Sequence, residues 1–260
     1  FGTDVYQLDR DVLAKTNELR TNPASFIPKL EAMLPNFNGN IYTRPDGSLL
    51  STNEGAAAVQ EAIAFLQTAA AVPALQWDQY LGFAAKELTT LQGATTQTGH
   101  TGPDGSTMQQ RIEKFASWSV TIGENIAYGN TDAETIIIQF FVDDGVSTRG
   151  HRTNLMKDTF AFMGSSSGPH GTYGHMTTID YGGAMTGNGF QPLTTIGAPS
   201  AIYPPPCDTF VTSATCPSRC TFAQNLCGVT PATVPATADQ YEFGTDVYQL
   251  DRDVLAKTNE

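Results

Sequence analysis

Apolar residues recur at helical spacing over much of the first 142 residues. Between Leu8 and Leu19 they fall at positions 8, 12, 13 and 19, which share one face of a helix. Val59, Ile63 and Leu66 repeat the pattern further along the chain. The spacing predicts helices over residues 8–20, 24–34, 53–71, 77–91 and 132–142.

Two further segments do not follow helical spacing. Residues 36–51 are rich in Asn, Gly and Pro, which predicts a loop. Residues 173–181, which include HMTTIDY, have the character of a strand. Helices that dominate the first two thirds of a chain, followed by strands, are typical of the α+β class or of a layered α-β-α arrangement.

The composition changes at about Phe190. From there to Gln240 long apolar residues are scarce, and Pro and Thr are abundant, as in the stretch VTPATVPATA. This composition is typical of a stiff, extended linker. We therefore expect a globular domain over residues 1–190 and a linker tail over residues 191–242, with O-linked glycans on threonines that lie beside prolines.

All the cysteines of the chain lie in this tail, at Cys207, Cys216, Cys220 and Cys227. An even number of cysteines in a short segment with few core residues predicts two disulfides, in one of three pairings. A zinc site is the alternative, but the closest pair, Cys216 and Cys220, is spaced more widely than the CxxC pair of a zinc knuckle. Disulfides predict an extracellular protein.

The sequence FGTDVYQLDRDVLAKTNE occurs twice without a change, at residues 1–18 and at residues 243–260, an offset of 242 residues. Glu260 corresponds to Glu18, which lies inside the first predicted helix, and no Gly/Ser linker precedes the second copy. We therefore expect these 260 residues to be a segment of a tandem-repeat chain, in which residues 243–260 begin the next repeat. The alternatives are an engineered duplication and a fibre that grows by non-covalent exchange of segments.

The chain is acidic, with a formal net charge of −12, of which the second copy contributes −2. Nucleic acids and anionic membranes are bound through clusters of Lys and Arg, which an acidic chain does not favour. No apolar run approaches the ~20 residues that a membrane-spanning helix needs. We therefore expect neither nucleic acid nor a lipid bilayer as a partner.

Candidate chemistry lies in Gly-rich stretches that carry histidines and carboxylates. The residues are His100 in GHTGPDGS, Glu124 in GENIAYG, Asp143, Asp144, His151 and Arg152 in DDGVSTRGHR, and His175 in GHMTTIDYG. Polar residues in such stretches often line a cleft, and two histidines with carboxylates can bind a divalent metal or exchange protons. Because no Ser or Cys nucleophile stands beside a candidate base, we do not expect an enzyme.

These stretches, in this order, resemble the CAP superfamily of cysteine-rich secretory proteins, antigen 5 and plant pathogenesis-related proteins. LAKTNELR at residues 13–20 resembles the first-helix signature of the family, and GENIA is the most specific element. The stretch DDGVSTRGHR is most similar to protist members. The resemblance covers residues 8–187 and implies an α-β-α sandwich with a central antiparallel sheet.

The CAP superfamily carries two histidines and two glutamates in a cleft, where some members hold zinc or another divalent ion. The resemblance assigns His100, Glu124 and His175 to three of these positions, with His100 and His175 as the candidate metal ligands. Asp143 or Asp144 falls near the fourth position, with a side chain one methylene shorter than that of glutamate. We expect Arg152 to bind one of these two aspartates.

Three functions follow, in order of preference. The first is a structural repeat unit of a secreted chain that forms an extracellular filament or surface appendage, with copies of itself as partners. The second is a secreted CAP-like binding module that holds a lipid, a glycan or a divalent metal in its cleft. The third is a metal-dependent hydrolase.

Overall fold

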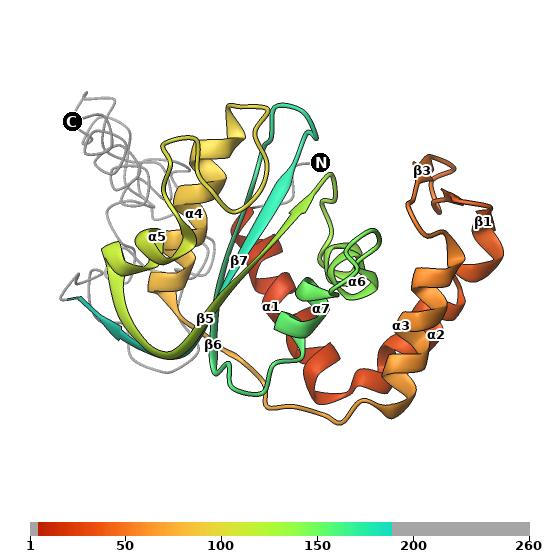
Figure 1. The fold of residues 1–260 in the computed structure, drawn as a ribbon, viewed down its shortest axis with the longest axis horizontal. Helices are drawn as coiled ribbons and strands as arrows, with labels where there is room; N and C mark the ends of the chain where they lie inside the picture. Colours follow the sequence, from red (N-terminus) through yellow and green to blue (C-terminus); the bar gives the residue numbers. More distant parts are fainter. Residues whose placement is uncertain (1–4, 189–260) are drawn as a thin grey trace, which may run out of the picture. The chain divides into compact units, whose positions relative to one another are not determined.

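The computed structural model describes residues 5–188 (Figure 1). The helices are α1 Val5–Thr21, α2 Ile27–Glu31, α3 Ala56–Thr68, α4 Gln79–Gly93, α5 Met108–Phe115, α6 Ala133–Val142 and α7 Gly150–Leu155, with 3-10 turns at Pro23–Phe26 and Leu34–Asn36. The strands are β1 Phe37–Asn38, β2 Ile41–Thr43, β3 Leu49–Ser51, β4 Gln76–Trp77, β5 Ala116–Tyr128, β6 Phe162–Gly168 and β7 Met176–Gly187.

The central sheet has four strands in the order β4-β6-β7-β5. β7 pairs antiparallel with both β5 and β6, and the short strand β4 pairs parallel with β6. The sheet is therefore antiparallel, as the resemblance implies, except at its β4 edge. The long β5–β7 pair sets Glu124 directly opposite Asp180.

Helices cover both faces of this sheet. α4 and α5 lie on one side, and α1, α6 and α7 lie on the other (Figure 1). Successive residues of β6 show the two faces: a Cβ atom on Gly164 would collide with the backbone of Gly82 in α4, whereas Ser165 Oγ donates to Asp9 O of α1 at 3.4 Å. This arrangement confirms the predicted α-β-α sandwich of the α+β class.

The main apolar core lies between the sheet and the helices of the α1 side. α6 supplies Phe140 and Phe141, which are 1% and 0% exposed, because its sequence AETIIIQFFV is apolar on nearly every side. The strands contribute Met163, Ile179 and Tyr181, which are all fully buried. The face of the sheet toward α4 and α5 carries polar side chains instead, and it is there that the candidate site lies.

The predicted helices at residues 8–20, 53–71, 77–91 and 132–142 are present, with ends that differ by a few residues. The predicted helix at 24–34 is broken into a 3-10 turn, the short helix α2 and a second 3-10 turn, with a proline in the first two positions of each. The proline rings remove the backbone donors that a continuous helix would use.

The prediction of a loop over residues 36–51 is wrong in part. A three-stranded antiparallel sheet of β1, β2 and β3 lies there. Its strands are two or three residues long and largely exposed, so they carry no alternation of buried and polar positions that the sequence pattern reveals. The strand predicted at 173–181 begins at Met176 and continues to Gly187.

None of the helices within residues 5–188 is both long and apolar enough to cross a membrane. The predicted tail at residues 191–242, with Cys207, Cys216, Cys220 and Cys227, and the second copy at 243–260 lie outside the described residues. The disulfides, the glycans and the domain boundary at residue 190 therefore stay predictions.

Candidate functional site

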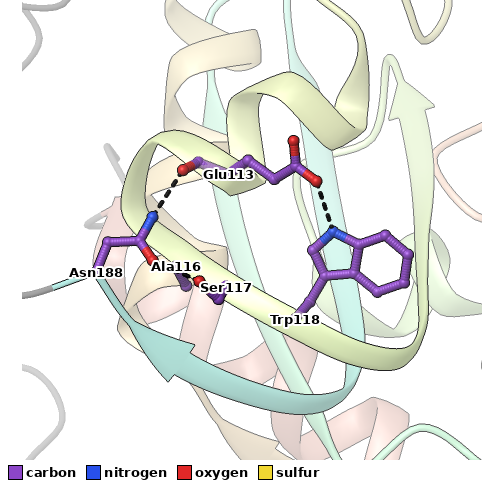
Figure 2. A pocket seen from close by; sticks show the side chains of 5 residues that line it. All are labelled: Glu113, Ala116, Ser117, Trp118 and Asn188. Atoms are coloured by element: carbon purple, nitrogen blue, oxygen red, sulfur yellow. Dashed lines mark hydrogen bonds between the residues drawn. The ribbon is translucent and has the colours of Figure 1, made fainter.

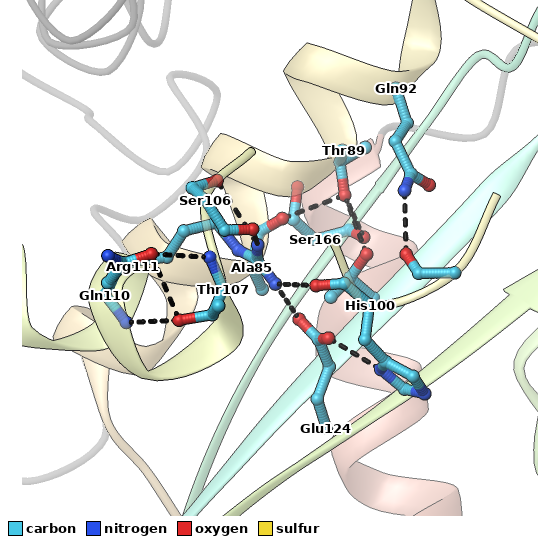
Figure 3. A network of polar contacts seen from close by, with 12 residues as sticks. Ala85, Thr89, Gln92, His100, Ser106, Thr107, Gln110, Arg111, Glu124 and Ser166 are labelled. Carbon is cyan, nitrogen blue, oxygen red and sulfur yellow. Dashed lines mark hydrogen bonds and ion pairs between the residues drawn. The ribbon is translucent and has the colours of Figure 1, made fainter. Parts of the chain in front are cut away.

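Glu124 lies inside strand β5, not in a loop, and its side chain is fully buried beneath α5. Both of its carboxylate oxygens are bound. Oε1 lies 2.7 Å from His100 Nδ1, and Oε2 accepts from Arg111 Nη2 at 2.7 Å. Figure 3 shows these groups pointing toward one another from the His100 loop, α5 and β5. Glu124 therefore joins a surface loop to a buried guanidinium.

Arg111 holds this arrangement in place. α5 begins with a capping box between Thr107 and Gln110, which sets Arg111 on the first full turn, facing the sheet. Its Nη1 donates to Ser106 O at 2.9 Å, and its Nη2 also donates to His100 O at 3.1 Å. Arg111 thus ties both ends of the stretch GHTGPDGS to α5, and it neutralises the buried charge of Glu124.

His100 is the exposed end of the network. Its side chain is 57% exposed, whereas those of Glu124 and Arg111 are fully buried. Because Nδ1 is held by Glu124, the ring has a fixed orientation and its Nε2 faces away from the carboxylate. The site therefore presents one oriented imidazole at the surface.

Asp180 faces Glu124 from β7 and is fully buried. Burial raises the pKa of Asp180 well above its ordinary value, and the negative charge of Glu124 raises it further. Burial next to the Glu124 carboxylate thus favours the protonated form of Asp180. Neither carboxyl oxygen of Asp180 has a hydrogen-bond partner among the described residues.

The polar network continues along the α4 side of the sheet. Glu87 of α4 pairs with Lys114 of α5, and burial raises the pKa of the Glu87 carboxyl. Thr89 donates to Ser166 O at 3.1 Å and lies 3.2 Å from Thr178 Oγ1 (Figure 3). Buried polar groups whose hydrogen bonds are only partly satisfied lower the stability of the fold. This face of the sheet is therefore a candidate functional site as well as a packing surface.

His175 stands apart from His100 and Glu124. It precedes β7, and its backbone carbonyl accepts from Gly129 N at 2.9 Å. Burial lowers the pKa of the His175 imidazole, which is therefore neutral near pH 7. Its Nδ1 is buried without a partner among the described residues.

Asp143 and Asp144 do not complete the cluster. The Asp143 carboxylate binds His151, accepting from its backbone N at 2.9 Å and lying 2.6 Å from its Nδ1. The Asp144 carboxylate accepts from the backbone N of Asn53 at 2.7 Å and from that of Glu54 at 2.8 Å. Each aspartate thus closes a loop at the end of α6.

The prediction that Arg152 binds one of these aspartates is wrong. Arg152 pairs with Glu61 of α3 at 2.6 Å, and its Nε donates to Phe141 O at 2.6 Å. Its Nη2 also donates to Val142 O, next to Asp143, at 3.2 Å, so the guanidinium lies at the end of α6 but its carboxylate partner is Glu61. Arg152 therefore fixes the helices of the α1 side to one another.

The motifs GENIA and GHRTN meet on the opposite face of β5 from Glu124. Asn125 Nδ2 donates to His151 O at 3.1 Å, and Asn154 Nδ2 donates to Asn125 Oδ1 at 2.9 Å. Gly123, on the same face, leaves room for the Phe160 ring, which a Cβ atom would approach to 2.8 Å. Adjacent residues of one motif thus serve different faces, because side chains alternate along a strand.

The order of these motifs and the sandwich fold agree with one family. The model described as "Cysteine-rich secretory protein family" (CAP) matches residues 13–181. The chain belongs to the CAP family. No curated protein matches it.

Two solved structures are similar to this CAP chain. An outer surface protein from Borrelia burgdorferi is 20% identical, with a TM-score of 0.35, over 43% of this chain and 78% of that one. An extracellular protein containing a SCP domain from Bacillus anthracis is 23% identical, with a TM-score of 0.34, over 43% of this chain and 34% of that one.

The residues present do not fit the divalent-metal cluster that the CAP resemblance implies. Within residues 5–188, no group of three or more His, Cys, Asp or Glu side chains is placed to hold a metal ion. Glu124 is already bound by His100 and Arg111, and no contact joins His175 to either of them among these residues. A zinc site at His100 and His175 stays a prediction without an assembled ligand set.

A pocket lies where α5 joins β5 and is lined by Glu113, Ala116, Ser117, Trp118 and Asn188 (Figure 2). Its polar groups bond one another: Trp118 Nε1 donates to Glu113 Oε1 at 3.1 Å, and Asn188 Nδ2 donates to Glu113 O at 2.8 Å. His100 and Glu124 do not line this pocket, so it offers no access to the candidate site.

Sequence reasoning missed Asp180, Asn125 and Asn154. Asp180 lies between Ile179 and Tyr181 in a strand, where the alternation of apolar and polar residues is that of an ordinary strand with one solvated face, so its burial leaves no signal in the sequence. The two asparagines lie within quoted motifs, but their partnership joins residues 29 positions apart and leaves no local signal.

Proposed function

We propose that this CAP domain is a structural unit of an extracellular chain that assembles in series with copies of itself. The observation that carries the proposal is the identical repetition of residues 1–18 at residues 243–260. The first copy is not a dispensable extension, because it provides most of α1, and Leu8 and Val12 are 4% and 0% exposed in the core. The second copy therefore repeats the sequence of a core element of this fold.

The composition between the two copies supports an extracellular setting and a spacer role. Residues 191–242 hold Cys207, Cys216, Cys220 and Cys227 among many prolines and threonines, which favours a disulfide-braced linker. The net charge of −12 supports solubility outside the cell and gives no basis for binding nucleic acid. The order of the segments, with a domain, then a linker, then a repeat of the first helix, supports a filament or surface appendage built of such units.

The proposal is tested by measuring the mass of the natural material twice, once under reducing and denaturing conditions and once under native conditions. Multiples of one repeat under denaturing conditions would establish a covalent tandem chain. A single repeat under denaturing conditions with multiples under native conditions would establish non-covalent assembly. A single repeat under both conditions would refute the structural proposal.

The alternative of a secreted binding module rests on a different observation, the oriented and exposed imidazole of His100 above the buried pair of Glu124 and Arg111. An imidazole with a free Nε2 can bond a hydroxyl group of a glycan or a lipid head group. We rank this function second because the pocket at Glu113 and Trp118 lies away from this imidazole.

A further inference from the structure

The pocket where α5 joins β5 takes no part in the Glu124 network, and its size and lining suit a ligand from solution (Figure 2). Its volume is about 410 Å³, which is within the range of pockets that hold small molecules. Of its lining, Glu113, Ser117 and Asn188 are exposed, and Trp118 is half-buried. The pocket is therefore open to solvent and contains one large aromatic ring.

Hydrogen bonds hold this lining in place without a ligand. Trp118 Nε1 donates to Glu113 Oε1 at 3.1 Å, which fixes the orientation of the indole. Ser117 Oγ donates to Asn188 Oδ1 at 2.8 Å, and Asn188 Nδ2 donates to Glu113 O at 2.8 Å. These bonds connect the last turn of α5, the first residues of β5 and the residue that follows β7. A ligand therefore meets side chains that need little further ordering.

Glu113 offers an acceptor beside this indole. Its Oε1 accepts from Trp118 Nε1 and from Gln109 Nε2, whereas its Oε2 has no hydrogen-bond partner within residues 5–188. A carboxylate oxygen is a strong acceptor for a hydroxyl group. The face of an indole carries partial negative charge and attracts the weakly positive C–H groups of a ring that packs on it. The pair therefore suits a ring that carries both C–H and hydroxyl groups.

The charges of the pocket disfavour other classes of ligand. Its lining holds one carboxylate and no Lys or Arg, and the adjacent Lys114 is paired with Glu87 of α4. Phosphates and carboxylates are typically bound by such cations, so an anionic ligand is disfavoured. A lipid chain needs an apolar cavity, whereas this lining is largely polar. A neutral ligand with several hydroxyl groups fits best.

Val120 shows that the same end of β5 is strained. Its φ is +75°, a conformation that β-branched residues rarely adopt, and the residue is 73% exposed. It lies where the β5–β7 pairing is irregular, between Ser119 and Ile122. Burial of the Val120 side chain therefore does not explain the strain. Because strained backbone is concentrated at functional sites, this observation supports a binding role for the end of β5 that carries Trp118.

We propose that the pocket at Glu113 and Trp118 binds a neutral saccharide. One face of the sugar ring packs on the Trp118 indole, and a hydroxyl group of the sugar donates to Glu113 Oε2. The site involves neither His100 nor any contact between repeat units. It therefore goes beyond the proposed function, and either of the two can fail without the other.

The test is an NMR titration of the isotope-labelled 260-residue chain with neutral trisaccharides at millimolar concentration. The saccharides are cellotriose, laminaritriose, maltotriose, mannotriose and chitotriose. The chain has two tryptophans, so its spectrum has two indole N–H signals, and Trp118→Phe identifies one of them by its loss. We expect at least one saccharide to shift the Trp118 signal saturably and to leave the signal of the buried Trp77 in place. If none of them shifts the Trp118 signal, the proposal is overturned.

Matched variants assign the contact. Glu113→Gln keeps an acceptor for Trp118 but removes the charge, and we expect the affinity for the saccharide to fall about tenfold. Glu31→Gln is the control, because it removes the same charge from an exposed position in α2, and it should leave the affinity unchanged. An unmoved Trp77 signal shows that each variant is folded. Equal affinities for Glu113→Gln and the wild type, or a shift of the Trp77 signal alone, would overturn the proposal.

Discussion

Glu124 of β5 and Asp180 of β7 are cross-strand partners whose carboxyl groups are both buried under the helices of the α4 side. Arg111 neutralises the first, and protonation neutralises the second. The two carboxyl groups at the centre of this polar face are therefore accommodated in different ways, Glu124 by an ion pair with Arg111 and Asp180 by its raised pKa. Its chemistry can be tested residue by residue.

Asp180→Asn should weaken the pH dependence of stability. The pKa of Asp180 is raised in the folded state, so the folded chain holds a proton that the unfolded chain releases above about pH 4. The stability that this proton provides is complete below that pH and is lost as the pH rises toward the folded pKa. The free energy of unfolding in urea should therefore fall less between about pH 5 and pH 8 in the variant than in the wild type. Parallel curves for the two proteins would contradict the raised pKa of Asp180.

Arg111→Met should destabilise the domain by roughly 3–5 kcal/mol, because it leaves the buried carboxylate of Glu124 without its charge partner. The measurement is urea unfolding near pH 7. The double variant Arg111→Met, Glu124→Gln removes both charges and should recover part of the loss. A double variant that is no more stable than the single one would show that packing of the Arg111 side chain, and not charge, sets the cost.

Asn17→Ala should lower the free energy of unfolding by about 1–3 kcal/mol, because it leaves both backbone groups of the buried Leu75 unpaired. Asn259→Ala, the same change in the second copy, is the control and should leave the unfolding of the domain unaltered. The measurement is urea unfolding. A loss of domain stability in Asn259→Ala would count against separate roles for the two copies.

Calorimetry with zinc should show no stoichiometric heat at the candidate site. No group of three or more ligand side chains is assembled within residues 5–188, and Glu124 is already bound by Arg111 and His100. His100→Ala is the comparison: heat of binding in the wild type that disappears in this variant would restore the metal site that the CAP resemblance implies. Reduced protein should be included, because zinc bound by the cysteines of the tail would persist in His100→Ala.

The elements that the sequence predicted are those whose burial is periodic. α1, α3 and α6 each bury an apolar stripe, and the spacing of that stripe is visible in the chain. β5 was not predicted, because the stretch GENIAY places Gly123, Glu124 and Asn125 at its centre, where polar groups are bound by residues from distant parts of the chain. A Gly-rich polar sequence is typical of a loop. Only the distant residues that bind Glu124 and Asn125 show that this stretch is a buried strand.

The candidate site, like the fold, was predicted from the sequence only in part. The sequence brought His100, Glu124 and His175 together through their motifs, but the structure joins only His100 to Glu124. It assigns Asp143 to His151 and Asp144 to the backbone before α3, since α6 ends in a left-handed residue at Asp143 that directs the chain back over its own end. No local pattern encodes that turn.

By itself the sequence determined the CAP family, the layered fold and the repetition of the first helix, because these depend on motif order, hydrophobic spacing and identity along the chain. Only the tertiary structure decided which carboxylates share a site, which arginine neutralises Glu124 and where the first helix packs. Those outcomes depend on contacts between residues distant in sequence, whose geometry is set when the helices and the sheet pack.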